Sequence, residues 1–152
     1  KMLRLNMQPM KYAKQGKEIT LYERDELGNI IYTGYTDSQG NFIYYLDDSG
    51  SKIPKIKGEK TGYYDPVDFE ANKLSEALMK EFGVDDSASY CQIVADKGEI
   101  PLESGDLVWK KSQVGIDKDG MVEEKTADYI VKGVADEGIT CDLFLLQKRV
   151  KQ

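Results

Sequence analysis

Three similar pentapeptides decide the fold class of the amino-terminal third: Asp25-Glu26-Leu27-Gly28-Asn29, Asp37-Ser38-Gln39-Gly40-Asn41 and Asp47-Asp48-Ser49-Gly50-Ser51. In each of them, glycine can adopt the positive φ angle that a tight turn needs, and Asp, Asn and Ser side chains can bond to the turn backbone. The runs between the turns are rich in β-branched and aromatic residues, which favour strands. The sequence therefore predicts a β-meander with strands at residues 19–24, 30–35 and 41–46.

The rest of the chain continues as short strands separated by turns and loops. Residues 47–62 are rich in turn formers and predict a loop, and the alternating run that follows predicts an extended segment at 63–72. Further strands are predicted at 90–95, 106–110, 129–134 and 141–150, with a polar loop at 112–127 and a hairpin turn at 136–138. The expected fold is a single mainly β domain over residues 1–152, a small antiparallel β-barrel or sandwich with one helix and long loops.

The one predicted helix covers residues 73–82, where the spacing of apolar residues changes. Leu74, Leu78 and Phe82 lie at i, i+4 and i+8 on one stripe, and Met79 lies beside it. An exposed apolar stripe needs a surface to pack on. That surface is either the chain's own barrel or a neighbouring molecule.

Composition excludes several classes of protein. At 40% hydrophobic residues the chain is too apolar to be disordered, and it has no histidine, which removes His-based triads and His metal sites. Cys91 and Cys141 lie in apolar strand patterns, where small buried hydrophobic side chains are expected. No apolar run is long enough to span a bilayer, and no signal peptide is visible, so we expect a cytoplasmic origin.

The charge is unevenly distributed along the chain. The total is −6, yet residues 1–17 hold five basic and no acidic residues, and we expect them to form an extended basic arm. Residues 147–152 hold three basic residues, whereas residues 115–146 hold eight acidic against three basic ones. Such asymmetry can steer complementary surfaces together in an assembly. Four lysines also lie in the predicted 47–62 loop: Lys52, Lys55, Lys57 and Lys60.

No catalytic or metal-binding motif stands out. The run Asp117-Lys118-Asp119-Gly120 resembles the start of a calcium loop, but that loop requires glycine at its sixth position and glutamate at its twelfth. Counting from Asp117, these positions hold Val122 and Asp128, so a hairpin turn explains the run better. We therefore predict that the chain is not an enzyme and holds no metal and no cofactor.

Several stretches resemble a known family. They are the run from Tyr12 to Asp25 with Gly28-Asn29-Ile30, the run Gly62-Tyr63-Tyr64-Asp65-Pro66-Val67-Asp68-Phe69-Glu70-Ala71-Asn72, and Lys80-Glu81-Phe82-Gly83-Val84-Asp85. With Asp128–Val134 and Leu143–Arg149, their order is similar to that in head-completion, or stopper, proteins, the small head–tail connectors of long-tailed phages and prophages of Gram-positive bacteria. The resemblance covers most of residues 12–150.

The resemblance implies a structural virion protein. A stopper is a small β-barrel that docks as a homo-oligomeric ring, a dodecamer or hexamer, below the portal and adaptor. It closes the channel after packaging, retains the DNA and presents the surface that binds the tail. The expected partners are further copies of the chain, portal and adaptor proteins, tail proteins and, through non-specific contact, packaged DNA, with no membrane. The expected location is the neck of the virion, assembled in the bacterial host cytoplasm.

Two sets of candidate residues follow from the resemblance. The segment at residues 73–89 takes the place of the gating loop, so Leu74, Leu78, Met79 and Phe82 become candidates for channel gating or inter-subunit contact. Lysines meet backbone phosphate without reading bases. The DNA-facing candidates are therefore the four loop lysines: Lys52, Lys55, Lys57 and Lys60.

Two alternative functions stay open. The chain could be a neighbouring ring component, either a tail terminator or an adaptor, although an adaptor is expected to be mainly helical. It could also be a monomeric β-barrel module that binds an oligosaccharide or single-stranded nucleic acid, an interpretation supported only by the basic loop.

Overall fold

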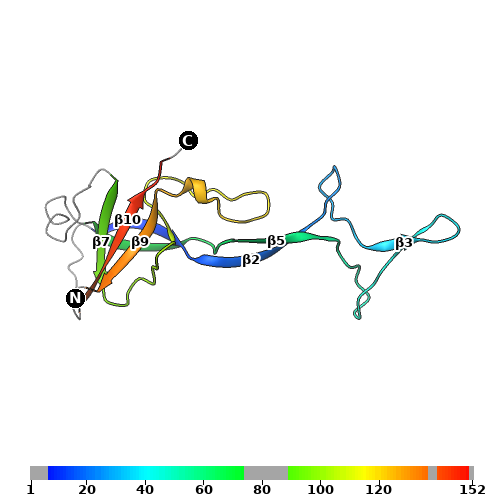
Figure 1. Cartoon of the computed structure of the whole chain (residues 1–152), viewed down its shortest axis with the longest axis horizontal. Helices are drawn as coiled ribbons and strands as arrows, with labels where there is room; N and C mark the ends of the chain where they lie inside the picture. Colours follow the sequence, from blue (N-terminus) through cyan, green and yellow to red (C-terminus); the bar gives the residue numbers. More distant parts are fainter. Residues whose placement is uncertain (1–6, 74–88, 137–139, 151–152) are drawn as a thin grey trace. The chain divides into compact units, whose positions relative to one another are not determined.

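The computed structural model describes residues 7–73, 89–136 and 140–150 of the chain. Regular structure within these ranges is β apart from a short 3-10 turn, η1 (Glu124–Thr126). The chain divides into two compact units, the first made of residues 1–17 and 62–152 and the second of residues 18–61 (Figure 1). We call the first the barrel unit and the second, for its three hairpins on one stem, the cloverleaf unit.

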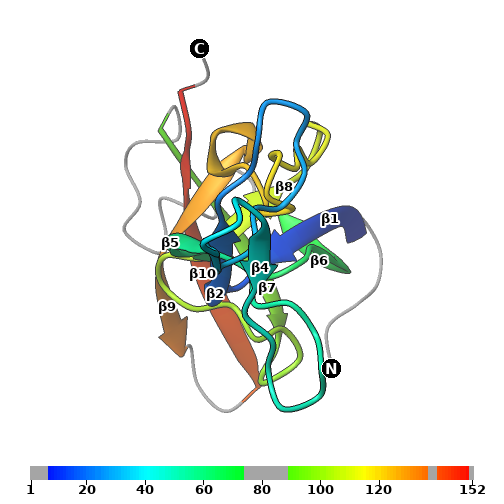
Figure 2. The same ribbon diagram turned by 90° about the vertical axis from the view of Figure 1, so that its right-hand side faces the viewer.

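Six of the described strands close into an antiparallel barrel. Their order is β1 (Met7–Ala13), β6 (Val67–Lys73), β7 (Tyr90–Asp96), β10 (Cys141–Lys148), β9 (Tyr129–Asp136) and β8 (Leu107–Trp109). Strands β8 and β1 complete the circle, with Lys11 opposite Trp109 and Ala13 opposite Leu107. Figure 1 shows β7, β10 and β9 side by side, and Figure 2 gives a second view of all six barrel strands. Closure leaves this sheet without a free edge.

The barrel unit contains two apolar clusters. The larger one includes Ile93, Val131 and Phe144, which are buried almost completely. The smaller one surrounds Trp109, whose indole Nε1 donates a hydrogen bond of 3.0 Å to Thr126 Oγ1. A buried indole N–H needs such an acceptor. Burial of this apolar surface is the main source of the barrel's stability.

The cloverleaf unit is built from one stem and three hairpins. Strand β2 (Gln15–Tyr22) pairs with β5 (Ile56–Tyr63) to form the stem, although residues 15–17 and 62–63 of these strands belong to the barrel unit. In the middle hairpin, β3 (Gly34–Thr36) pairs with β4 (Phe42–Tyr44). Each of the two outer hairpins is closed by one isolated β-bridge, between Arg24 and Ile30 in the first and between Leu46 and Lys52 in the second. In Figure 1 the three hairpin tips point in different directions. No residue from Glu18 to Thr61 is buried.

One turn design recurs in both units. Asp37 Oδ1 accepts hydrogen bonds of 2.9 Å from the backbone N–H groups of Gln39 and Asn41, while Gly40 has a φ of +86°. The turns that begin at Asp25, Asp47 and Asp117 have the same bonds, with donor–acceptor distances between 2.9 and 3.0 Å. These four turns confirm the sequence-based predictions, including the turn expected in place of a calcium loop.

The mainly β barrel is confirmed, but two local predictions are wrong. The predicted loop at 47–62 contains most of β5, and its residues pair with β2. The predicted meander is a cloverleaf instead, because the run at 30–36 divides its pairing between β4 and two segments outside the middle hairpin. Each run folds back on its own turn or pairs with a more distant segment, as Tyr32 does with Pro54.

Other predictions map onto the barrel unit. Strands were expected near β6 to β10, and each of them is found. The segment at 1–17, expected to be an extended arm, supplies β1. Of the predicted helix at 73–82, Lys73 is the last residue of β6, and the rest lies outside the described residues. Cys91 is buried as expected, whereas Cys141 is only partly buried.

Candidate anion site at one end of the barrel

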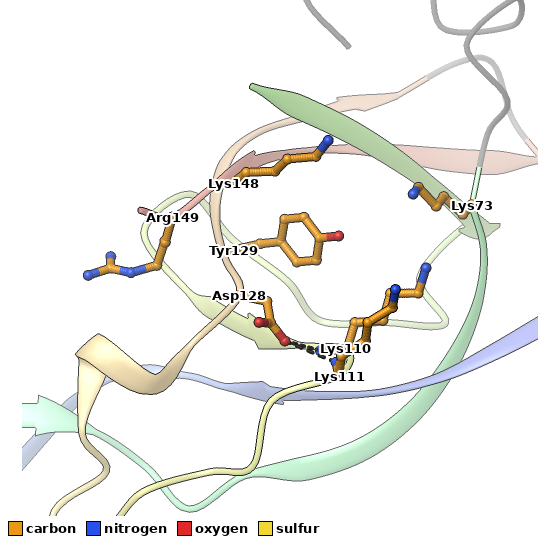
Figure 3. Close-up of a pocket in the computed structure, with 7 residues that line it drawn as sticks. All are labelled: Lys73, Lys110, Lys111, Asp128, Tyr129, Lys148 and Arg149. Carbon is orange, nitrogen blue, oxygen red and sulfur yellow. Dashed lines mark hydrogen bonds between the residues drawn. The ribbon is translucent and has the colours of Figure 1, made fainter. Parts of the chain in front are cut away.

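A basic cavity of about 330 Å³ lies in the barrel unit (Figure 3). Seven residues line it: Lys73, Lys110, Lys111, Asp128, Tyr129, Lys148 and Arg149. Five of these are cationic, in a chain whose total charge is −6. The cavity is therefore a strong local departure from the average charge of the molecule.

The ends of four barrel strands bring these residues together. Lys73 is the last residue of β6, and Lys110 directly follows β8. Tyr129 is the first residue of β9 and lies opposite Lys148, the last residue of β10. Because neighbouring strands are antiparallel, the start of β9 and the ends of β8 and β10 meet at the same end of the barrel. Barrel mouths are common places for ligand sites.

Asp128 organises the segment that follows β8. Its Oδ2 accepts hydrogen bonds of 2.9, 3.0 and 3.0 Å from the backbone N–H groups of Lys110, Lys111 and Ser112. Its Oδ1 accepts a 2.6 Å hydrogen bond from the Ser112 hydroxyl. Three consecutive amides held by one carboxylate fix the backbone from which the Lys110 and Lys111 side chains project.

Tyr129 is the buried residue of the cavity. Figure 3 shows its hydroxyl directed among Lys73, Lys110 and Lys148, while the Arg149 guanidinium points away from it. Burial, together with the nearby Cys91 thiol and a hydrogen bond to it, raises the pKa of Tyr129 to about 12. Burial also raises the pKa of Cys91. Tyr129 therefore keeps its proton at neutral pH and can act as a hydrogen-bond donor.

The lysines of the cavity repel one another. Burial, followed by the positive charges of Lys73 and Lys111, lowers the pKa of Lys110. Within the described ranges, Lys73, Lys110 and Lys111 form no ion pair with a carboxylate. Arg149 does have such a partner, because its Nη1 lies 3.3 Å from Glu124 Oε1. The arrangement suits an anion.

A second charged cluster in the barrel unit has a structural role. The Lys14 ammonium lies 2.5 Å from Oδ2 of the fully buried Asp106 and 2.8 Å from Glu103 Oε1. The same Asp106 oxygen accepts a 2.8 Å hydrogen bond from the Glu103 backbone N–H. Burial alone would lower the pKa of Lys14, but the hydrogen bonds and charges of the two carboxylates outweigh it and raise the pKa. This cluster ties the β1–β2 junction to the segment before β8.

The candidate residues from the sequence lie elsewhere. The Lys52 ammonium lies 4.1 Å from the ring centroid of Tyr44, and Lys55 pairs with Glu23 at 3.1 Å. Lys57 and Lys60 lie on β5, so all four lysines belong to the cloverleaf unit. The apolar candidates lie outside the described residues: Leu74, Leu78, Met79 and Phe82. The DNA-facing role of the lysines and the gating role of the apolar residues therefore stay predictions.

The basic cavity was not predicted from the sequence. Its lysines are spread from position 73 to position 148 and never form a run along the chain. The available signal was positional, because Lys73, Lys110 and Lys148 each lie at or just beyond the end of a strand. Only the barrel topology shows that these strand ends meet.

Comparison of the chain with family models, with curated proteins and with solved structures finds no match. No helix in the described part of the chain is long and apolar enough to cross a membrane. Across residues 7–73, 89–136 and 140–150, no three Cys, Asp or Glu side chains are grouped so that they could hold a metal ion.

Proposed function

We propose that the chain is a structural protein of a phage neck, a head-closure or stopper subunit that assembles into a ring between the portal–adaptor complex and the tail. One observation carries this proposal: the cloverleaf unit exposes many apolar side chains and buries none. Six large apolar side chains in or next to the middle hairpin have exposed fractions between 39% and 58%: Tyr35, Phe42, Ile43, Tyr44, Tyr45 and Leu46.

Two pairs of these exposed rings contact each other, Phe42 with Tyr44 and Tyr35 with Tyr45, and exposed apolar clusters often mark interaction sites. Aromatic side chains are enriched in protein–protein interfaces, where tyrosine can bury its ring and keep its hydroxyl bonded. A two-stranded hairpin also has little stability of its own in water. Contact with neighbouring copies in a ring would stabilise the cloverleaf unit and cover these side chains. The small closed barrel and the unevenly distributed charge are compatible with such a subunit.

Removing the gene from a phage or inducible prophage that carries it tests the proposal. We expect capsids that package DNA, lose it before tails attach and accumulate without tails. Mass spectrometry should find the protein in wild-type particles, and electron microscopy should place it as a ring in the neck. Tailed, DNA-filled particles in its absence would overturn the proposal, as would its absence from wild-type particles.

A double variant tests the role of the cloverleaf surface. Phe42→Ser with Tyr45→Ser removes two exposed aromatic side chains, and Val134→Ser with Val150→Ser is the control, since both valines are exposed on the barrel unit. Both proteins should fold, but only the first should fail to enter particles. Equal incorporation of the two variants would show that the exposed aromatic side chains do not mediate assembly, and the proposal would lose its main support.

A further inference from the structure

We propose that the basic cavity at the end of the barrel is a binding site for a phosphate group. The phosphate could come from the backbone of duplex DNA or from free inorganic phosphate, which present the same tetrahedral oxygens. The inference does not depend on the function proposed above, because it concerns the barrel unit alone and is tested on the purified chain.

The geometry of the donors favours a small, highly charged anion. Lys73, Lys110 and Lys148 lie at or just beyond the ends of three different strands, yet their side chains gather around one hydroxyl, that of Tyr129 (Figure 3). Ammonium groups donate up to three hydrogen bonds each, whereas the single proton of the Tyr129 hydroxyl is already directed to the Cys91 thiol. Such a set suits several oxygens on one centre, as in phosphate, better than the two coplanar oxygens of a single carboxylate.

Within the described ranges, three of the cavity lysines, Lys73, Lys110 and Lys111, have no carboxylate partner. Asp128 directs its oxygens to the amides of residues 110–112, and this holds Lys110 and Lys111 at the cavity. Like charges held together cost free energy unless a counter-ion binds. A bound phosphate would remove that repulsion.

The size and exposure of the cavity agree with this ligand. Its volume of about 330 Å³ lies at the lower end of the range typical of ligand pockets. Lys73, Lys111 and Lys148 are exposed, so a phosphate that belongs to a polymer can reach them. Because the net charge of −6 disfavours DNA binding by the chain as a whole, measurable DNA binding would point to a local basic site.

The test compares two double variants that remove the same charge. Lys110→Gln with Lys148→Gln changes the cavity, whereas Lys118→Gln with Lys125→Gln changes two exposed lysines of the barrel unit outside it. Fluorescence anisotropy with a short labelled DNA duplex measures the first source of phosphate. Isothermal titration calorimetry with sodium phosphate, against sodium chloride of equal ionic strength, measures the second. Fluorescence of Trp109, the single tryptophan, checks that each variant is folded.

We expect wild-type protein to bind at least one of the two probes. The cavity variant should bind that probe at least about tenfold more weakly, and the control variant should stay within about twofold of wild type. If the probe is DNA, the cavity variant should also show a smaller salt dependence, by about one unit of slope for each lysine that no longer meets a phosphate. Competition by inorganic phosphate beyond that of matched chloride would show that both sources use one site.

Two results would overturn the proposal. One is that the folded wild-type protein binds neither DNA nor inorganic phosphate. The other is that the control variant loses as much affinity as the cavity variant, since binding would then follow total charge and not this site. Both measurements use the purified chain. Failure of the proposed stopper function in phage particles would therefore not change their outcome.

Discussion

The barrel unit encloses two clusters of buried apolar side chains, whereas the cloverleaf unit, built from the same kinds of residues, has none. Isoleucine and aromatic residues are typical of strands, and the cloverleaf unit is rich in both. The difference is closure. Six strands that form a circle create an inside, but a two-stranded stem with hairpins leaves both faces in contact with water.

The recurring turn makes the same comparison at the scale of a few residues. The Asp117 turn ends at Met121, which is buried and packs close to Gly62. The Asp37 turn ends at Asn41, which is exposed. The bonds inside the two turns are alike, so turn chemistry is local, while burial depends on what the rest of the unit places nearby.

The largest expected effect compares one phenylalanine from each unit. Phe144→Ala removes a fully buried side chain from the larger apolar cluster and should reduce the free energy of unfolding by about 3–5 kcal/mol. Phe42→Ala removes an exposed ring from the cloverleaf unit and should change it by less than about 1 kcal/mol. Urea titration followed by Trp109 fluorescence measures both. Similar losses for the two variants would show that the cloverleaf unit contributes to barrel stability.

Most barrel strands and the turns of both units could be predicted from the sequence, whereas β1 and the pairing of the cloverleaf strands could not. The positions of β6 to β10 could be predicted from alternating apolar and polar residues and from turn residues, because strands of a closed barrel have one buried face. The β5 strand was missed, because Ile56–Tyr63 contains two glycines and two lysines and has the composition of a loop. It forms because the three hairpins bring it beside β2, and that pairing is not visible in its own residues.

An intermediate effect compares two ion pairs. Lys14→Met would leave the buried Asp106 carboxylate without its cation and should cost about 3 kcal/mol of folding free energy, near the lower end for a broken buried pair. Lys55→Met breaks the pair with Glu23 on the cloverleaf surface and should cost less than about 1 kcal/mol. Urea titration at pH 7 measures the difference. Equal costs would mean that the Lys14 pair is as solvated as the surface pair.

The pH dependence of the Lys14 contribution has a definite sign. Because the folded-state pKa of Lys14 is raised above its ordinary 10.5, its contribution is complete below pH 10.5 and is lost as pH rises through the folded value. Hydrogen bonding to Lys14 lowers the pKa of Glu103 from 4.5, so the Glu103 contribution is present above pH 4.5 and is lost on acidification. The gap in stability between wild type and Lys14→Met should therefore stay constant between about pH 6 and about pH 9. A gap that narrows within that range would contradict this assignment.

The candidate site could be predicted less well than the fold. The lysines predicted to face DNA lie close together along the chain: Lys52, Lys55, Lys57 and Lys60. In the structure two of these contact groups of the cloverleaf unit, Lys52 with aromatic rings and Lys55 with Glu23. The cavity lysines converge only through the barrel order, in which β6, β8 and β10 end near the start of β9. Charge density in space depends on topology, and a single sequence carries little information about it.

The smallest expected effect returns to the two Asp-x-x-Gly turns. Asp117→Ala removes the acceptor for the backbone N–H groups of Asp119 and Met121 and should lower barrel stability by about 1 kcal/mol, since Met121 is buried. Asp37→Ala removes the equivalent bonds to Gln39 and Asn41, but nothing buried depends on them. Barrel unfolding should stay within about 0.5 kcal/mol of wild type, and only amide exchange at residues 39 and 41 should accelerate. Asp→Asn at each position keeps an acceptor oxygen and is the matched control, expected to lie near wild type. If Asp37→Ala lowered barrel stability as much as Asp117→Ala, the hairpins of the cloverleaf unit would have to transmit their order to the barrel, and the two units could no longer be treated as independently stabilised.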